Sequence, residues 1–253
     1  MEKYFEVPRQ HQILRGMLHI PDVAAAPCPA VIFCHGFTSN MAGPHCLYVK
    51  LARALAQHGF LCVRFDFTGS GNSDGDFSRV TLTSEMQDGV SIYQYVKNLP
   101  YVDAGRIALL GHSMGSLAAM MTNAHLKGAI WKNVLMGTAG TLFHELIAPL
   151  TGSALDECLN RGCFSVNGYT VGRALLDDVY SQNFFETARE MSGQTLLIHG
   201  RSDGESPVYN SVALKEVLGE RAELLLVDGA DHCFSNEKYD REIVGRVLTF
   251  LQK

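Results

Sequence analysis

The strongest constraint on the fold of this 253-residue chain is a regular alternation of short, β-rich apolar runs with longer segments of helical periodicity. Near the C-terminus, for instance, the strand-like run at residues 222–227 is followed by residues 236–251, whose apolar positions recur every three or four residues. Such alternation is typical of a mostly parallel sheet covered by helices on both faces. We therefore predict an α/β fold with a doubly wound, mostly parallel sheet.

The expected elements follow one another in a simple order. Residues 4–7 and 13–20 form an opening antiparallel pair. The later strands are expected at residues 30–34, 60–65, 106–110, 130–136, 195–199 and 222–227. The helices are expected at residues 45–58, 82–99, 113–126, 208–218 and 236–251.

Residues 138–191 interrupt this alternation and are too many for an ordinary connection between a strand and a helix. Within them, residues 164–171 indicate a β-hairpin around Asn167-Gly168, because Asn-Gly favours the tight turn of a two-residue loop. Helix-like stretches at 142–150 and 173–180 flank it. We expect residues 138–191 to be an inserted cap of helices plus a β-hairpin, on a core formed by residues 1–137 and 192–253.

Composition and charge exclude several classes of protein. With 47% hydrophobic and 19% charged residues, the chain can bury a core and is not expected to be disordered. A net charge of -5 argues against nucleic acid or an anionic membrane as a partner. The charged start of the chain lacks the apolar run of a signal peptide, and seven Cys occur without a C-x-x-C pair, which favours a cytoplasmic protein. Pairing of Cys158 with Cys163 stays open, and a homodimer is compatible with the sequence.

The pattern Gly-x-Ser-x-Gly, which surrounds the nucleophile in many serine hydrolases, occurs three times, around Ser73, Ser113 and Ser202. A nucleophilic serine in this pattern needs a buried strand that runs directly into a helix. Ser113 has the apolar run IALL shortly before it and the helix-forming SLAAMMTNAHL after it. Ser73 lies in a loop on both sides, and a proline delays the helix after Ser202. The context selects Ser113 as the nucleophile.

A serine nucleophile needs a histidine base and a carboxylate that orients it. His232 lies in a loop between the last strand and the last helix, which opens at the same sheet edge as Ser113. Asp203 follows the strand at 195–199 and completes the order Ser, Asp, His that is known from hydrolases. Asp228 and Asp231 are competitors, but they are close to His232 in sequence and cannot easily approach its far ring nitrogen.

The other groups of the expected site lie beside these three residues. We expect the oxyanion hole to use the N–H of Met114, directly after the nucleophile, and the N–H of Phe37, in the turn after the strand at 30–34. Three histidines at strand ends are expected to have structural roles through hydrogen bonds to the backbone: His35, His112 and His199.

Together these motifs resemble the α/β-hydrolase superfamily and, more narrowly, the bacterial cinnamoyl (feruloyl) esterases. The matching stretches are HGF at 35–37, RFDFTGSGNSDG at 64–75, GHSMG at 111–115, HGRSDGESP at 199–207 and DGADHCF at 228–234. The resemblance implies the triad Ser113, Asp203 and His232, with oxyanion amides at Phe37 and Met114. The chain departs from the pattern at Ser206, where valine is usual, and at Ser116, where glycine is frequent.

These residues predict a carboxylic ester hydrolase that works through an acyl-enzyme on a small-molecule ester, without metal or cofactor. The resemblance favours hydroxycinnamoyl (feruloyl-type) esters, with Tyr169 and Phe164 of the cap as contacts of the substrate. A monoacylglycerol-type lipase, a thioesterase, a peptidase and an acyltransferase remain alternatives, because all of them can use the same acyl-enzyme chemistry.

Overall fold

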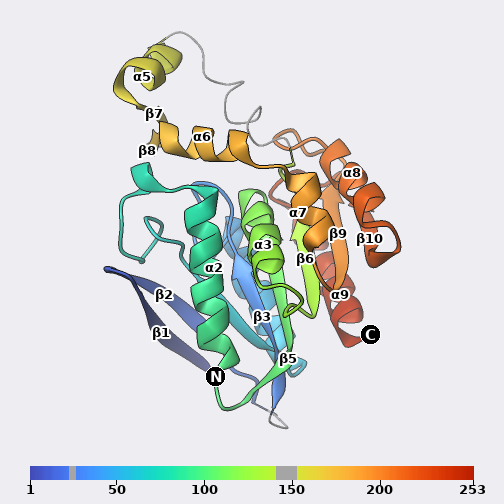
Figure 1. The fold of residues 1–253 in the computed structure, drawn as a ribbon. Helices are drawn as coiled ribbons and strands as arrows, with labels where there is room; N and C mark the ends of the chain where they lie inside the picture. The colour runs from blue at the N-terminus through green and yellow to red at the C-terminus, as the bar shows by residue number, and fades with distance from the viewer. Residues whose placement is uncertain (23–26, 141–152) are drawn as a thin grey trace.

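In the computed structural model, which describes residues 1–22, 27–140 and 153–253, eight strands form one sheet in the order β1-β2-β4-β3-β5-β6-β9-β10 (Figure 1). The pairs β1–β2 and β2–β4 are antiparallel and the other neighbours are parallel. In sheet order the strands are β1 (Glu2–Arg9), β2 (Gln12–His19), β4 (Leu61–Phe65), β3 (Cys28–Cys34), β5 (Val102–His112), β6 (Lys132–Met136), β9 (Gln194–Gly200) and β10 (Ala222–Val227). The predicted mostly parallel sheet is confirmed.

Helices cover both faces of this sheet (Figure 1). One face carries α1 (Leu47–Gln57) and α9 (Glu237–Gln252). The other carries α2 (Leu82–Lys97), α3 (Met114–His125), α7 (Phe184–Glu190) and α8 (Tyr209–Leu218). Central strands are therefore buried on both sides: in β5, Ile107 and Leu109 join one core, and Ala108 and Leu110 join the other. This two-sided burial explains the continuous apolar runs of the sequence.

Several predicted boundaries move by a few residues. The helix expected from residue 45 begins at Leu47, because Pro44–Cys46 forms a 3-10 turn in which His45 and Cys46 have positive φ. The helix expected to reach residue 99 ends at Lys97. The strand expected at 106–110 is longer, Val102–His112, and runs directly to Ser113. Two further 3-10 turns lie at Phe77–Arg79 (η2) and Gly219–Arg221 (η3).

Between β6 and β9 the structure describes α5 (Ser153–Arg161), β7 (Cys163–Val166), β8 (Tyr169–Gly172), α6 (Arg173–Ser181) and α7. The strands β7 and β8 form the hairpin expected around Asn167-Gly168, and both turn residues have positive φ. The helix α7 was not expected, although Asn183 caps it by accepting a hydrogen bond from the N–H of Glu186. α5 was not expected either, and the helix expected at 142–150 lies outside the described residues. Cys158 and Cys163 are free thiols.

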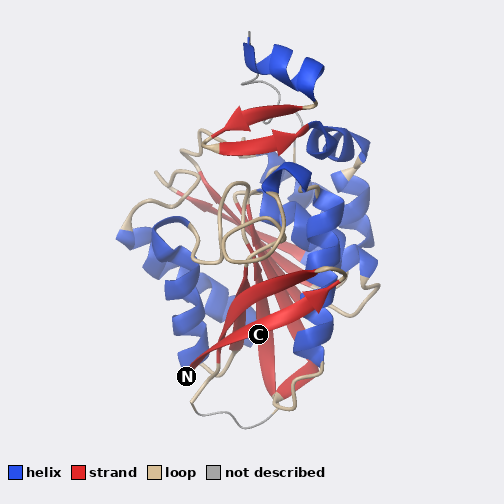
Figure 2. Cartoon of the chain, turned by 90° about the vertical axis from the view of Figure 1, so that its left-hand side faces the viewer, coloured by secondary structure: helices blue, strands red, loops and turns tan. Residues whose placement is uncertain are grey.

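The hairpin and α6 lie above the C-terminal ends of the central strands (Figure 1), and Figure 2 shows the same arrangement from the side of β1 and β2. Asp178 of α6 accepts hydrogen bonds from the N–H and the hydroxyl of Thr83 at the start of α2. On β8, a Cβ at Gly172 would lie 2.0 Å from the carbonyl oxygen of Ser78, so the hairpin backbone packs tightly on η2. Side-chain and backbone contacts therefore fix the hairpin and α6 above the C-terminal ends of the strands.

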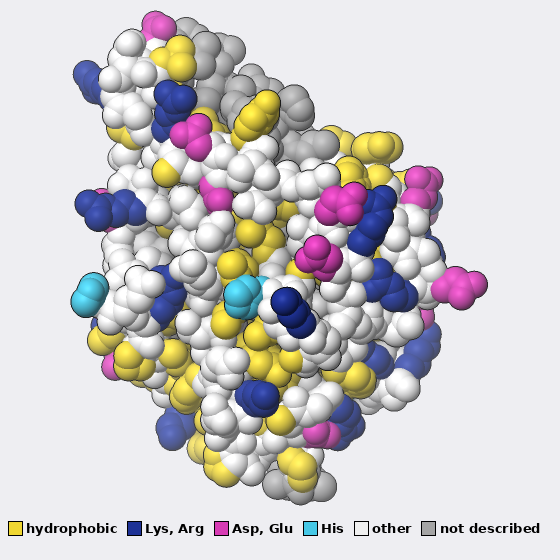
Figure 3. All heavy atoms as spheres, viewed as in Figure 1, with side chains coloured by type: hydrophobic (Ala, Val, Ile, Leu, Met, Phe, Trp, Pro, Cys, Tyr) yellow, Lys and Arg dark blue, Asp and Glu magenta, His cyan; other side chains and the backbone are white. Residues whose placement is uncertain are grey.

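On the face seen in Figure 3, hydrophobic side chains gather near the middle, and acidic and basic side chains are interspersed around them. Within the part of the chain that the structure describes, no helix has the length and apolar character needed to cross a bilayer.

Two helical glycines provide a matched test of the packing between α3 and β3. A Cβ at Gly115 would lie 2.2 Å from the carbonyl oxygen of His35 and 2.3 Å from that of Cys34, whereas a Cβ at Gly245 of α9 meets nothing within 4 Å. We expect Gly115→Ala to lower the free energy of unfolding by about 3 kcal/mol, because backbone atoms must move. Gly245→Ala should raise it by roughly 0.5–1 kcal/mol. Urea unfolding measures both, and wild-type stability of the Gly115 variant would contradict the described packing.

Candidate active site

Ser113 lies on a strained turn between β5 and α3. Its φ of 55° and ψ of -127° fall in a region that non-glycine residues rarely adopt, and only the surrounding structure can maintain it. A Cβ at Gly111 would lie 2.4 Å from the carbonyl oxygen of Gly115, and the space at Gly115 is equally restricted. Both flanking glycines are therefore required for the turn that exposes the serine, as its sequence context predicts.

The other two Gly-x-Ser-x-Gly motifs have different surroundings. The Ser73 hydroxyl donates to the carbonyl of Asp66 and accepts from the N–H of Arg15, so it joins the loop after β4 to β2. Ser202 is exposed in the turn after β9, and the next helix begins only at Tyr209. Neither serine connects a strand directly to a helix.

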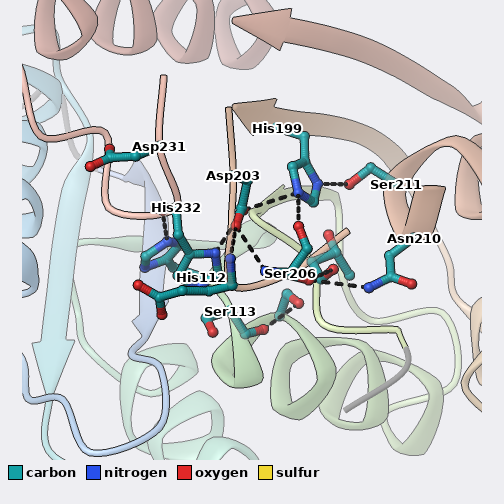
Figure 4. Close-up of polar contacts among 12 residues, drawn as sticks. His112, Ser113, His199, Asp203, Ser206, Asn210, Ser211, Asp231 and His232 are labelled. Atoms are coloured by element: carbon teal, nitrogen blue, oxygen red, sulfur yellow. Dashed lines mark hydrogen bonds and ion pairs between the residues drawn. The ribbon is translucent and has the colours of Figure 1, made fainter. Parts of the chain in front are cut away.

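His232 and Asp203 lie together at the C-terminal edge of the sheet (Figure 4). Nδ1 of His232 donates to Oδ2 of Asp203 at 2.7 Å, and the Asp203 side chain is only 1% exposed. The competing carboxylates have other partners: Asp231 accepts from the N–H of Ser235, and Asp228 is 90% exposed beside Arg201. Of these three carboxylates, Asp203 is the one hydrogen-bonded to His232.

Asp203 stays ionised although it is buried. Burial acts to raise the pKa of its carboxyl, but hydrogen bonds from His199 and His232 and from the N–H of Ser206 outweigh it, so the pKa lies well below its usual range. The negative charge can therefore hold the His232 ring in the tautomer with hydrogen on Nδ1, which leaves Nε2 able to accept a proton.

His112 fixes the backbone of the His232 loop. Its Nε2 donates to the carbonyl oxygen of His232 at 2.9 Å, and its Nδ1 accepts from the Tyr48 hydroxyl at 2.9 Å. Burial and the neighbouring charge of His232 lower the pKa of His112 to about 3, which keeps the ring neutral. Gly137 at the end of β6 lies against both rings, since a Cβ there would be 3.2 Å from His232 and 3.4 Å from His112.

The turn after β3 approaches Ser113 closely. A Cβ at Gly36 would lie 3.0 Å from the Ser113 Cβ and 3.6 Å from its Oγ. His35 braces this turn: its Nδ1 donates to the Gly36 carbonyl, and its Nε2 accepts from the N–H of Phe67. Phe37 follows in the same turn. Met114 is the first residue of α3, where an N–H has no partner within the helix.

A row of aromatic rings connects this turn to the hairpin. The rings of Phe37 and Phe77 are 5.6 Å apart, and those of Phe77 and Tyr169 are 4.6 Å apart. Tyr169 is half-buried, whereas Phe164 is 0% exposed and belongs to the core. The full burial of Phe164 also gives it a packing role in the core, and the substrate contacts of Tyr169 and Phe164 stay predictions.

The predicted backbone contacts of the three strand-end histidines are confirmed, and each of them contacts a different part of the site. Tyr48 and Phe77 were not identified from the sequence, and no local motif distinguishes them. Among residues 1–22, 27–140 and 153–253, no group of three or more His, Cys, Asp or Glu is arranged to hold a metal ion.

Comparisons with known proteins identify related chains. The profile of a hydrolase family described as "Serine aminopeptidase, S33" matches residues 25–163. Human mitochondrial palmitoyl-protein thioesterase ABHD10 is 24% identical over 229 residues, covering 85% of this chain and 70% of that protein. An uncharacterised 31.7 kDa protein of Escherichia coli is 32% identical over 87 residues, 34% of this chain, and this chain spans only 29% of its length.

Solved structures share the fold. Est1E from Butyrivibrio proteoclasticus, with ferulic acid bound, superposes with a TM-score of 0.86 at 21% identity, covering 98% of this chain and 100% of the other. A putative hydrolase from Agrobacterium vitis S4 superposes with a TM-score of 0.81 at 21% identity, with 99% and 98% coverage. These likenesses confirm the predicted α/β-hydrolase fold.

The pairing of Asp203 with His232 can be tested by removing one charge. Asp203→Asn should lower kcat for hydrolysis of p-nitrophenyl acetate by roughly 10³- to 10⁴-fold, because an amide favours the wrong tautomer of His232. Asp231→Asn is the matched control in the His232 loop and should change kcat less than about threefold. Steady-state kinetics of the two folded variants test this pairing. An equal loss of kcat in both variants would show that Asp203 does not orient His232.

Proposed function

This chain belongs to the hydrolase family described as serine aminopeptidase, S33. We propose that it is a carboxylic ester hydrolase whose catalytic residues are Ser113, His232 and Asp203. In general terms, the chain is a serine hydrolase of the α/β-hydrolase class. The observation that carries the proposal is the 2.7 Å contact between His232 and the buried Asp203, at the same sheet edge as the strained Ser113 turn.

In the proposed reaction, Oγ of Ser113 attacks the acyl carbon of the ester while Nε2 of His232 takes the hydroxyl proton. The same proton then passes to the departing alcohol, leaving an acyl group on Ser113. Water, deprotonated by His232, attacks the acyl carbon and releases the acid with regeneration of the serine. Asp203 stabilises the imidazolium that forms in each half of the cycle.

The N–H groups of Phe37 and Met114 are proposed to hold the oxyanion. Two features support this role: the close approach of Gly36 to Ser113, and the position of Met114 at the start of α3. Each such donor contributes roughly 3–4 kcal/mol to stabilisation of the transition state in comparable enzymes.

The proposed substrate is an ester whose acyl group is aromatic, of the hydroxycinnamoyl (feruloyl) type. The rings of Phe37, Phe77 and Tyr169 extend from the turn after β3 to the hairpin. An aryl ring that packs against an aromatic side chain is stabilised by about 0.5–1.5 kcal/mol, in addition to the stabilisation from burying its surface. The likeness in fold to Est1E, whose structure contains ferulic acid, is consistent with this choice.

A thioesterase is the second candidate, supported by the sequence likeness to ABHD10 along 85% of the chain. A thioester passes through the same acyl-enzyme, so the two candidates differ in the acyl and leaving groups rather than in the catalytic residues.

The nucleophile is tested with a fluorophosphonate probe, which phosphonylates activated serines. We expect labelling of the wild type and of Ser73→Ala and Ser202→Ala, the serines of the two other motifs. Ser113→Ala should lose labelling, and kcat for p-nitrophenyl acetate should fall by several orders of magnitude. Labelling that persists in folded Ser113→Ala would remove this residue from the proposed role.

The acyl specificity is tested by comparing kcat/KM for methyl ferulate, p-nitrophenyl octanoate and a palmitoyl thioester. We expect methyl ferulate to be preferred, and Tyr169→Ala to lower its kcat/KM by about 3- to 10-fold, with little effect on p-nitrophenyl acetate. Tyr4→Ala, at the far edge of the sheet, is the matched control. A preference for the thioester would favour the second candidate, and a preference for the octanoate would indicate a lipase.

A further inference from the structure

The Asp203 carboxylate accepts hydrogen bonds from four groups. Its Oδ1 accepts from the N–H groups of Glu205, at 2.9 Å, and Ser206, at 2.8 Å. Its Oδ2 accepts from His232 at 2.7 Å and also lies 3.1 Å from Nε2 of His199. One carboxylate oxygen is therefore shared by two imidazole rings, only one of which has a role in the proposed reaction (Figure 4).

His199 is held so that its Nε2 carries the hydrogen. The residue lies in β9 and is 0% exposed. Its Nε2 faces two acceptors, Oδ2 of Asp203 and the carbonyl oxygen of Ser206, each at 3.1 Å. Its Nδ1 lies 2.7 Å from the Ser211 hydroxyl at the start of α8. A nitrogen between two acceptors must donate, so His199 withdraws electron density from the oxygen that orients His232.

We propose that His199 is a positioning residue that shares Oδ2 of Asp203 with His232, and thereby both fixes the carboxylate and limits the basicity of His232. This inference rests on the proposed function, since it concerns the base of that reaction. The direction of the effect does not depend on the charge of His199: in either protonation state, Nε2–H partly neutralises the carboxylate. Without it, Asp203 would stabilise the protonated form of His232 more strongly.

The titratable groups around His232 are few among the described residues. Asp203 contacts it from the β9 side, with His199 on the same carboxylate, and His112 faces it from the end of β5. His45 reaches the same loop, where its Nε2 lies 2.9 Å from the carbonyl oxygen of Cys233. Asp231 and Cys233 lie beside it in its own loop. Burial lowers the pKa of His112 to about 3 and raises that of the Cys233 thiol to about 11. Between pH 5 and 9 both stay neutral, so a change at His199 acts on His232 mainly through Asp203.

The experiment compares His199→Leu, which removes the donor, with His199→Gln, which retains an N–H near the position of Nε2. We measure kcat and KM for p-nitrophenyl acetate from pH 5 to 9, with thermal unfolding as a check of folding. In His199→Leu, the pH at which kcat/KM declines on the acid side of its profile should rise, by several tenths of a unit to about one unit, because His232 becomes easier to protonate. The plateau of kcat should fall roughly tenfold, while KM stays nearly constant. His199→Gln should remain close to the wild type in the acid side of its kcat/KM profile, in the plateau of kcat and in KM.

A folded His199→Leu variant with the wild-type acid limb would overturn the proposal, as would equal shifts in the two variants. If His199→Leu does not fold, ¹⁵N NMR of the histidine rings in the wild type decides instead. We expect His199 to carry its hydrogen on Nε2 throughout, and its ring signals to change at the pH where His232 titrates. A ring protonated only on Nδ1, or signals that ignore the titration, would overturn the proposal.

The proposed function and the role of His199 are tested by separate measurements. Loss of fluorophosphonate labelling in Ser113→Ala tests the proposed function, and it does not involve His199. The NMR titration tests the coupling between His199 and His232, and it does not require any turnover.

Discussion

The close approach of α3 to the end of β3 determines the geometry of the whole site. Gly115 lies against the carbonyl groups of Cys34 and His35, and Gly36 lies against Ser113. Any side chain at these glycines would separate the strained serine from the turn that contains Phe37. The proposed nucleophile and the proposed oxyanion donors are therefore positioned by contacts between backbones, which tolerate much less change than contacts between side chains.

Histidines at the ends of β3, β5 and β9 extend this arrangement to the loops. His35 holds the turn of Phe37, His112 holds the carbonyl of His232, and His199 contacts Asp203. An imidazole suits such a position because its two nitrogens can donate to one group and accept from another. Loops that leave neighbouring strands are thereby fixed to one another by imidazole hydrogen bonds.

The sequence predicted the strands, most of the helices and the pairing of His232 with Asp203, because these depend on local periodicity and on motifs at strand ends. It could not predict which carboxylate oxygen two histidines share, or that Tyr48 of α1 would reach His112 at the end of β5. Such contacts join residues far apart in sequence and depend on ring orientation, which no local pattern encodes. Phe164 illustrates the same limit, because the Asn-Gly turn predicts the hairpin, whereas the full burial of Phe164 depends on packing against distant parts of the chain.

The charge distribution of the site follows from burial. His35 and His112 have pKa values lowered mainly by burial, so they surround the site with neutral donors and acceptors. Asp203 keeps its charge because four hydrogen bonds replace the water that burial removed. Its negative charge contacts His232 directly, so the basicity of that ring depends on how the charge is shared. His199, which takes part of the hydrogen-bonding capacity of Asp203, is therefore placed to adjust the basicity that the carboxylate confers on His232.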